Sequence, residues 1–279
     1  SYLPLGFLAN SELADLEFTT TGNGFDFQNR LFTAATGVTE DVWHRIGSFR
    51  IYGDGVNVFE EDGQGYCKYD STVNKGDLTY SFTAETDGFV CVQLDLPKRN
   101  EFYVSVNGEE LYKEKISLQQ MLAVKDVKAG DEITLRIVCP NGESSSTTVT
   151  AAVLDADVFN QGYQVLSAST WRLTKFRSTR LEGTIDCDRD GLLYTSIPQN
   201  GNWHVFVDGQ ETQTVKVGNC MTAVSLTEGT HTVRFVYRNP GFELGWKISA
   251  ASAGVFALWI FMTRKDRKRG KSARKPAEN

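Results

Sequence analysis

The chain has 279 residues, of which 41% are hydrophobic and 23% are charged, with 25 Gly and 6 Pro. This length suffices for two ordinary domains, and the composition excludes a disordered, collagen-like or small disulfide-stapled protein. The formal net charge is −6, from 29 Lys and Arg against 35 Asp and Glu. Because phosphate contacts need a basic surface, we expect no nucleic-acid partner.

The first forty residues contain one helical pattern. Phe25, Leu31, Phe32 and Ala35 follow roughly helical spacing, and Gly37 is suited to end a helix. The chain opens at Ser1 without an initiator Met or a signal peptide. We therefore expect residues 1–40 to be a helical and loop segment that leads from a preceding membrane helix of a longer protein.

Residues 87–139 and 190–237 resemble each other in hydrophobicity and in turn chemistry. Each contains a strand-like run, FYVSV or WHVFV, followed by a turn dipeptide, Asn107-Gly108 or Asp208-Gly209. Apolar and polar residues alternate with a period of two, and these dipeptides favour the turn between antiparallel strands. We therefore predict a mainly β protein with two tandem antiparallel β-sandwich domains of jelly-roll type and a few short helices.

The boundary between the two copies carries a second helical pattern. Val158, Phe159, Tyr163 and Leu166 lie on one side of a predicted helix that begins near Asp155. We therefore place the first sandwich at residues 41–153 and the second at residues 154–240.

Residues 244–263 read LGWKISAASAGVFALWIFMT and contain one charged residue, Lys247. Twenty helical residues span about 30 Å, which matches the hydrocarbon core of a bilayer. Trp246 and Trp259 lie towards the two ends, as interfacial aromatic residues do. We predict a transmembrane helix here, so the lipid bilayer is an expected partner. A buried core helix is the alternative.

The charge distribution predicts an orientation for this helix. In residues 264–279, eight Lys and Arg stand against two acidic residues, which gives +6 and leaves −12 for residues 1–263. The positive-inside rule places this basic tail in the cytoplasm and residues 1 to about 240 outside. A cell-wall sorting signal would have the same end, but no LPxTG-type site lies upstream of the apolar segment.

These features resemble the carboxy-terminal part of the bacterial YfhO-like membrane proteins. The resemblance is most specific between Asp190 and Gly245, in DGLLYTSIP, NGNWHVFVDGQ, LTEGTHTVRFVY and NPGFELG. Residues 2–7, 27–37 and 154–159 support it. The resemblance implies a multi-pass protein of the bacterial cell membrane, in which further transmembrane helices precede this extracytoplasmic region and are its partners.

The resemblance also implies a function. Such proteins look like C-type glycosyltransferases, which use a lipid-linked sugar to glycosylate teichoic acid or another cell-envelope polymer. Their catalytic carboxylates would precede Ser1, so no catalytic residue is assigned here and the enzymatic activity of this chain stays open. We expect an accessory region that contacts a lipid-linked sugar or an anionic envelope glycan. The alternative is a non-enzymatic structural or protein-interaction module of a cell-envelope complex.

Three aromatic residues are the candidate sugar contacts: Trp171, Tyr194 and Trp203. Sugar rings stack on exposed aromatic faces, but half-buried packing inside a sandwich is the usual role of such residues and is the alternative here. A basic patch that could attract an anionic polymer consists of Arg172, Lys175, Arg177 and Arg180. The alternative for this patch is a charged edge strand.

The sequence predicts no metal site and no cofactor. The residues considered were Cys67, Cys91, Cys139, Cys187, Cys220, His44, His204 and His231, and none has metal-ligand spacing. For Cys91 and Cys139, a disulfide and buried free thiols are the alternatives. Asp186-Cys-Asp188-Arg-Asp190-Gly191 resembles the opening of a calcium loop, but Ile197 stands where a Glu is required, and a hairpin turn explains the pattern.

Overall fold

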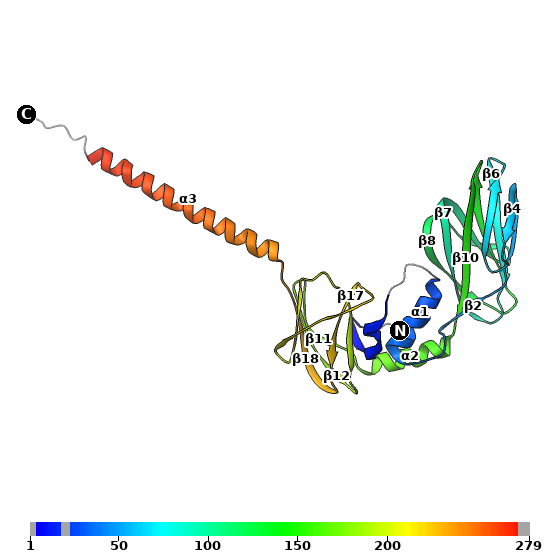
Figure 1. Ribbon diagram of the computed structural model, residues 1–279, viewed down its shortest axis with the longest axis horizontal. Coiled ribbons are helices and arrows are strands. Elements are labelled where there is room, and N and C mark those ends of the chain that lie inside the picture. Colours follow the sequence, from blue (N-terminus) through cyan, green and yellow to red (C-terminus); the bar gives the residue numbers. More distant parts are fainter. Residues whose placement is uncertain (1–3, 18–22, 273–279) are drawn as a thin grey trace, which may run out of the picture.

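A computed structural model describes residues 4–17 and 23–272 (Figure 1). The predicted fold class is confirmed, because two antiparallel β-sandwiches and a few short helices precede one long apolar helix. Tyr2 and Leu3 of the opening motif and residues 273–279 of the basic tail lie outside the described residues.

The first sandwich encloses a core of apolar side chains from both of its faces. The long strands β7 and β8 form a hairpin whose register shifts between Leu96 and Asn100. At this bend β7 passes from one face, where it pairs with β10, to the other, where it pairs with β9. The strands are β2 (Trp43–Ile46), β3 (Arg50–Asp54), β4 (Val56–Glu61), β5 (Tyr66–Ser71), β6 (Lys75–Thr83), β7 (Gly88–Val106), β8 (Glu109–Val127), β9 (Glu132–Pro140) and β10 (Ser144–Leu154).

The second sandwich consists of a five-stranded sheet, in the order β11-β12-β18-β14-β15, and a four-stranded sheet, in the order β1-β13-β17-β16. Side chains from both sheets form one core. The strands are β1 (Gly6–Ala9), β11 (Arg172–Arg177), β12 (Arg180–Cys187), β13 (Gly191–Pro198), β14 (Trp203–Val207), β15 (Gln210–Thr212), β16 (Val215–Val217), β17 (Met221–Leu226) and β18 (Gly229–Tyr237).

Strand β1 is where the structure departs from the expectation that residues 1–40 precede both sandwiches. Gly6–Ala9 pairs with β13 in the second sandwich, and Leu8 is fully buried in its core. On its other side β1 is bonded to the segment before β11, because Leu8 N donates to Ser169 O and Trp171 N donates to Gly6 O. The sequence did not predict this strand because a run of four apolar residues is too short to show a periodicity of hydrophobic residues. In addition, its partner strand β13 follows the whole first sandwich in the sequence.

Strand pairing shows that the two sandwiches are copies of one unit. Gly88 pairs with Val127 in the first, and Gly191 pairs with Leu226 in the second. In the first copy the neighbour of this strand is β10, which follows β9 directly. In the second copy β18 leads into a membrane-type helix, and β1 occupies the place of β10. The first sandwich is therefore inserted between β1 and the rest of the second.

Short helices join the two sandwiches, as Figure 1 shows. They are η1 (Ser11–Asp15), α1 (Gly24–Thr36) and α2 (Ala156–Ala168). Gly37 ends α1 in the left-handed region at φ 78°, and the Asp155 side chain caps the first N–H groups of α2. One face of this layer packs on β1 and β13, and the other packs on β2 and β10.

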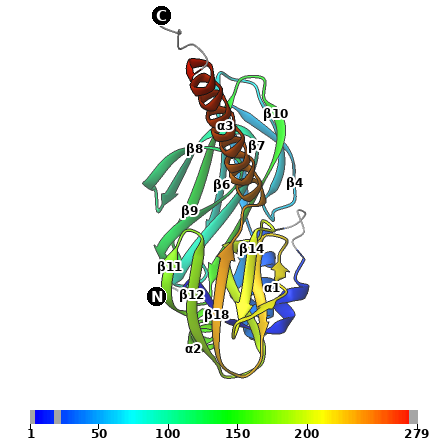
Figure 2. The ribbon, with the colours of Figure 1, turned by 90° about the vertical axis from the view of Figure 1, so that its left-hand side faces the viewer.

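The last helix, α3 (Pro240–Ser272), follows β18 after two residues. Asn239 caps it, since Phe242 N donates to Asn239 Oδ1 at 3.1 Å. Residues Pro240–Met262 are long and apolar enough to span a membrane, and no part of this segment is buried in the protein. Figure 2 shows α3 leaving the second sandwich beside β14 and β18, with the first sandwich behind.

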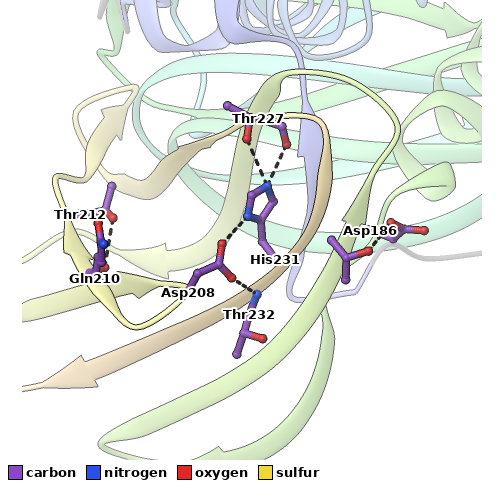
Figure 3. A network of polar contacts seen from close by, with 8 residues as sticks. Asp186, Asp208, Gln210, Thr212, Thr227, His231 and Thr232 are labelled. Atoms are coloured by element: carbon purple, nitrogen blue, oxygen red, sulfur yellow. Dashed lines mark hydrogen bonds and ion pairs between the residues drawn. The ribbon is translucent and has the colours of Figure 1, made fainter.

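The turn after β14, shown in Figure 3, has the backbone geometry of the turn after β7 but different side-chain contacts. Asp208 has φ 51°, accepts a hydrogen bond from Thr232 N at 2.8 Å and lies 2.7 Å from Nδ1 of His231. In the first copy Asn107 has φ 50° and donates instead to Asp131. The His231 contact lowers the pKa of the Asp208 carboxyl from its ordinary value of 3.8.

Asp208→Asn tests this contact, because Asn tolerates the left-handed turn and keeps the acceptor for Thr232 but lacks the charge. A carboxyl with a lowered folded-state pKa contributes stability above its unfolded pKa and loses it as the pH falls through the folded pKa. We expect the variant to melt about 2 °C lower at neutral pH, with the difference disappearing as the pH falls through the lowered pKa of Asp208. Circular dichroism melts of the full chain at several pH values provide the measurement.

The reciprocal variant Asn107→Asp is the matched control. It places a second carboxylate beside Asp131, so its destabilisation should grow as the pH rises. A pH-independent difference for Asp208→Asn would show that the contact contributes no charge interaction.

Candidate functional site

Trp171 lies in the core of the second sandwich with 1% of its surface exposed. Its ring centroid is 5.2 Å from that of Phe235. Gly183 makes room for the indole, because a Cβ at this position would lie 2.8 Å from Trp171 Nε1. Both faces of the Trp171 ring are therefore occupied by protein, and its role is packing.

Tyr194 lies on the outer face of β13, towards the helical layer. Its ring centroid is 5.5 Å from that of Phe7, and burial raises the pKa of its hydroxyl. Together with side chains from η1, α1, α2 and β2, it lines an apolar cavity of about 330 Å³ between the sandwiches. This cavity suits an apolar group and offers few polar atoms to orient a sugar.

Trp203, at the start of β14, is half-buried and borders an open depression of about 470 Å³. One side of its ring packs edge-on against Tyr237, with the ring centroids 5.1 Å apart, and against Phe235 at 6.3 Å. The remaining lining is mostly polar and comes from β14, β15 and the loop after β15: His204, Val205, Glu211, Thr212, Gln213 and Thr214. Of the three candidate aromatic residues, Trp203 combines partial exposure with polar neighbours.

Hydrogen bonds hold the polar groups around Trp203 in place. Nδ1 of His204 lies 2.6 Å from Oε1 of Glu211, and Gln199 Nε2 donates to Thr214 Oγ1 at 2.7 Å. Asn202 Nδ2 donates to the Tyr237 hydroxyl at 3.2 Å. A partly exposed aromatic residue beside amides and hydroxyls is suited to contact a sugar by stacking and hydrogen bonding. Glu211 is the single carboxylate among the described lining residues, so the arrangement favours binding over glycosidic cleavage.

The Trp203 depression lies at the end of the sandwich from which the membrane-type helix departs. Arg238 N donates to Asn202 O at 2.9 Å, and α3 begins two residues later. Thr214 lines the depression and is bonded to Gln199 of another loop, and no sequence motif marks either residue. The sequence therefore suggests Trp203 as a candidate contact but gives no sign of the polar groups around it.

The three carboxylates of the calcium-like motif accept hydrogen bonds from different segments of the chain. Asp186 accepts from Thr230 Oγ1, and Asp190 accepts from Glu228 N. Asp188 accepts from Ser169 Oγ. Among the described residues, no three His, Cys, Asp or Glu side chains are grouped to hold a metal ion. The motif occupies the end of β12 and the connection to β13, and these two strands belong to different sheets, so the segment is a turn between sheets and not the hairpin turn that the sequence suggested.

The five cysteines are free thiols in the structure. Cys91 lies on β7 and Cys139 on β9, and burial raises the pKa of these thiols to about 11 and about 12. Of the two alternatives for this pair, the structure shows buried or half-buried thiols. Cys220 is the exposed one.

The basic residues of the candidate patch lie along β11 and the start of β12. The register of β11 shifts between Leu173 and Lys175. Arg180 forms an ion pair with Glu182 at 2.8 Å, which lowers the pKa of the Glu182 carboxyl. The patch therefore carries fewer available charges than the sequence implies.

Comparisons with known proteins identify a family and several distant structures. Residues 1–249 match the family model described as bacterial membrane protein YfhO. No curated protein matches the chain.

Three solved structures illustrate the distant similarities, which carry no argument about the ligand of this chain. TmCBM61 in complex with beta-1,4-galactotriose is 14% identical over 39% of this chain and 92% of that one, with a TM-score of 0.28. A family 35 carbohydrate binding module from Clostridium thermocellum is 11% identical over 41% of this chain and 98% of that one, with a TM-score of 0.29. A cycloisomaltooligosaccharide glucanotransferase from Paenibacillus sp. is 8% identical over 75% of this chain and 49% of that one, with a TM-score of 0.28.

The family model spans both sandwiches and the start of the apolar helix. Its coverage agrees with the sequence stretches between Asp190 and Gly245 that carry the resemblance, and the last helix agrees with a membrane location. The chain belongs to the bacterial YfhO membrane protein family.

Proposed function

We propose that residues 1 to about 240 form the extracytoplasmic accessory region of a multi-pass bacterial membrane protein. In this proposal the parent protein glycosylates teichoic acid or another cell-envelope polymer from a lipid-linked sugar, and the Trp203 depression holds a sugar beside the membrane. The position of Trp203 carries the proposal, since this half-buried aromatic residue and its polar neighbours lie next to the start of α3.

A lipid-linked sugar stays at the membrane surface because its lipid remains in the bilayer. A sugar site on the accessory region must therefore lie within reach of the headgroups. Asn202 is bonded to Arg238, and Phe242, an exposed apolar residue of α3, follows four residues after Arg238. The Trp203 depression meets this requirement, whereas the apolar cavity beside Tyr194 lies between the sandwiches.

The charge of the body favours a single sugar over a long anionic polymer as the ligand. Residues 1–263 carry a formal charge of −12, which repels a polyanion at distances up to the Debye length of about 8 Å and beyond at low salt. The Trp203 depression adds Glu211 and His204 but no Lys or Arg among its described lining residues. An uncharged sugar ring can enter such a site without an electrostatic penalty.

A structural or protein-interaction module of an envelope complex is the second candidate function. The observation that favours it is the burial of Trp171 and the enclosure of Tyr194, which leave one of three candidate aromatics for ligand contact. Under this alternative the sandwiches act as spacers, and Trp203 serves only to pack against Tyr237.

Trp203→Ala is expected to reduce glycan binding at least tenfold, because it removes the stacking surface, while Trp203→Phe retains most of it. The full chain in lipid nanodiscs is first screened on an array of envelope glycans, and the affinity for the best ligand is then measured by calorimetry. Tyr52→Ala, which removes an exposed aromatic ring from the first sandwich, is the matched control. Absence of glycan binding, or unchanged binding by Trp203→Ala with the fold intact, would favour the structural alternative.

Cys220 tests the orientation of the region. It is exposed, whereas the other four thiols are buried or half-buried. We expect a membrane-impermeant maleimide to label Cys220 of the parent protein in intact cells, as located by peptide mapping, and Cys220→Ser to remove this label. A cysteine introduced by Lys271→Cys should be labelled only after permeabilisation. The reverse pattern would place the sandwiches in the cytoplasm.

A further inference from the structure

Phe176 is the most exposed large hydrophobic residue among those that the structure describes, with 74% of its surface accessible. Its exposed fraction is slightly larger than that of Phe242 at the start of α3, which is 73% exposed. Phe176 lies next to the end of β11, an edge strand whose register has shifted, opposite Leu181 of β12. A phenyl ring gains free energy when it moves from water to an apolar environment, so this position is suited to an apolar partner.

A backbone hydrogen bond holds the hairpin that carries Phe176 close to the first residue of α3. Tyr237 N donates to Thr179 O at 2.9 Å, and Thr179 lies in the turn between β11 and β12. Tyr237 is separated from Pro240, the first residue of α3, by two residues. Covalent continuity therefore keeps the hairpin at the level where α3 enters the bilayer.

Unpaired cations flank Phe176 in the sequence or follow the end of β18, although the body as a whole is acidic. Lys175 and Arg177 flank it in sequence, and Arg238 follows Tyr237. Among the described residues, none of these three cations has a carboxylate within 4.0 Å, and Glu182 is already paired with Arg180. Guanidinium groups bind phosphate oxygens well, and basic residues near a membrane are attracted to anionic lipids.

We infer that the β11–β12 hairpin is a membrane-surface contact in which Phe176 inserts between lipid headgroups and Lys175, Arg177 and Arg238 bind the phosphates of anionic lipids. This contact adds a second attachment beside α3 and limits the tilt of the second sandwich. It depends on the insertion of α3 in a bilayer and is independent of sugar binding, so failure of either idea leaves the other testable.

The test compares the two ends of the same sheet. Ser178 lies at the exposed turn of the hairpin, and Glu228 lies next to Gly229 at the opposite end of β18. Nine strand residues separate these ends by about 26 Å. A bimane fluorophore is attached at either position through Ser178→Cys or Glu228→Cys, in a Cys220→Ser background, and the full chain is placed in nanodiscs with brominated acyl chains.

We expect quenching at position 178 to exceed that at position 228 severalfold in discs of phosphatidylcholine and phosphatidylglycerol, and to weaken in phosphatidylcholine alone. Phe176→Ser and the double variant Arg177→Ser, Arg238→Ser should each reduce quenching at position 178. Arg172→Ser, which removes a cation farther along β11, should leave it unchanged. Melting curves establish that every variant is folded.

Three results would overturn the inference. Equal quenching at positions 178 and 228 would show that the hairpin does not meet the bilayer. Unchanged quenching in Phe176→Ser would show that the phenyl ring does not insert. Quenching that does not respond to phosphatidylglycerol or to the arginine substitutions would remove the role of anionic headgroups.

Discussion

The pairing of β1 with β13 is the constraint on which the rest of the architecture depends. Four residues, Gly6–Ala9, complete the sheet of a sandwich whose other strands begin more than 160 residues later. Leu8 and Ala9 are fully buried, and backbone hydrogen bonds hold β1 on both sides. Because β1 occupies the place that β10 has in the first sandwich, the second sandwich receives strands from both ends of the described body. The first sandwich is consequently an insertion, carried on the helical layer away from α3.

This arrangement gives the two copies of one β unit different tasks. The second copy is continuous with α3, so its Trp203 depression and its β11–β12 hairpin lie where a bilayer surface would be. The first copy meets the second through η1, α1 and α2, whose apolar side chains pack on both. The turns of the two copies retain one backbone geometry while their side chains differ, as Asn107 and Asp208 illustrate. The two copies thus share a backbone scaffold and differ in their surface chemistry.

The sequence predicted the features that depend on local patterns. Alternating residues and Asn-Gly or Asp-Gly turns indicated the sandwiches, Gly37 and Asp155 marked a helix end and a helix start, and the long apolar run indicated α3. Strand β1 was not predicted because it is short and its partner strand is distant in the sequence. The burial of Trp171 also could not be predicted from the sequence, since it depends on the space left by Gly183 on the neighbouring strand. Side-chain burial is a property of packing between strands, which periodicity alone does not determine.

The most direct test of this account determines which of the two sandwiches β1 pairs with. The first sandwich offers an alternative pairing position, because it has the same strand arrangement as the second. Tyr194 pairs with Phe7, and the equivalent position of the first sandwich holds the native thiol Cys91. The variant Phe7→Cys, Tyr194→Cys, Cys220→Ser is oxidised mildly in nanodiscs, and its linked peptides are mapped by mass spectrometry. A disulfide between positions 7 and 194, with Cys91 left free, is the predicted result. A link between position 7 and Cys91, or no link at all in the folded protein, would contradict the claim that β1 closes the second sandwich.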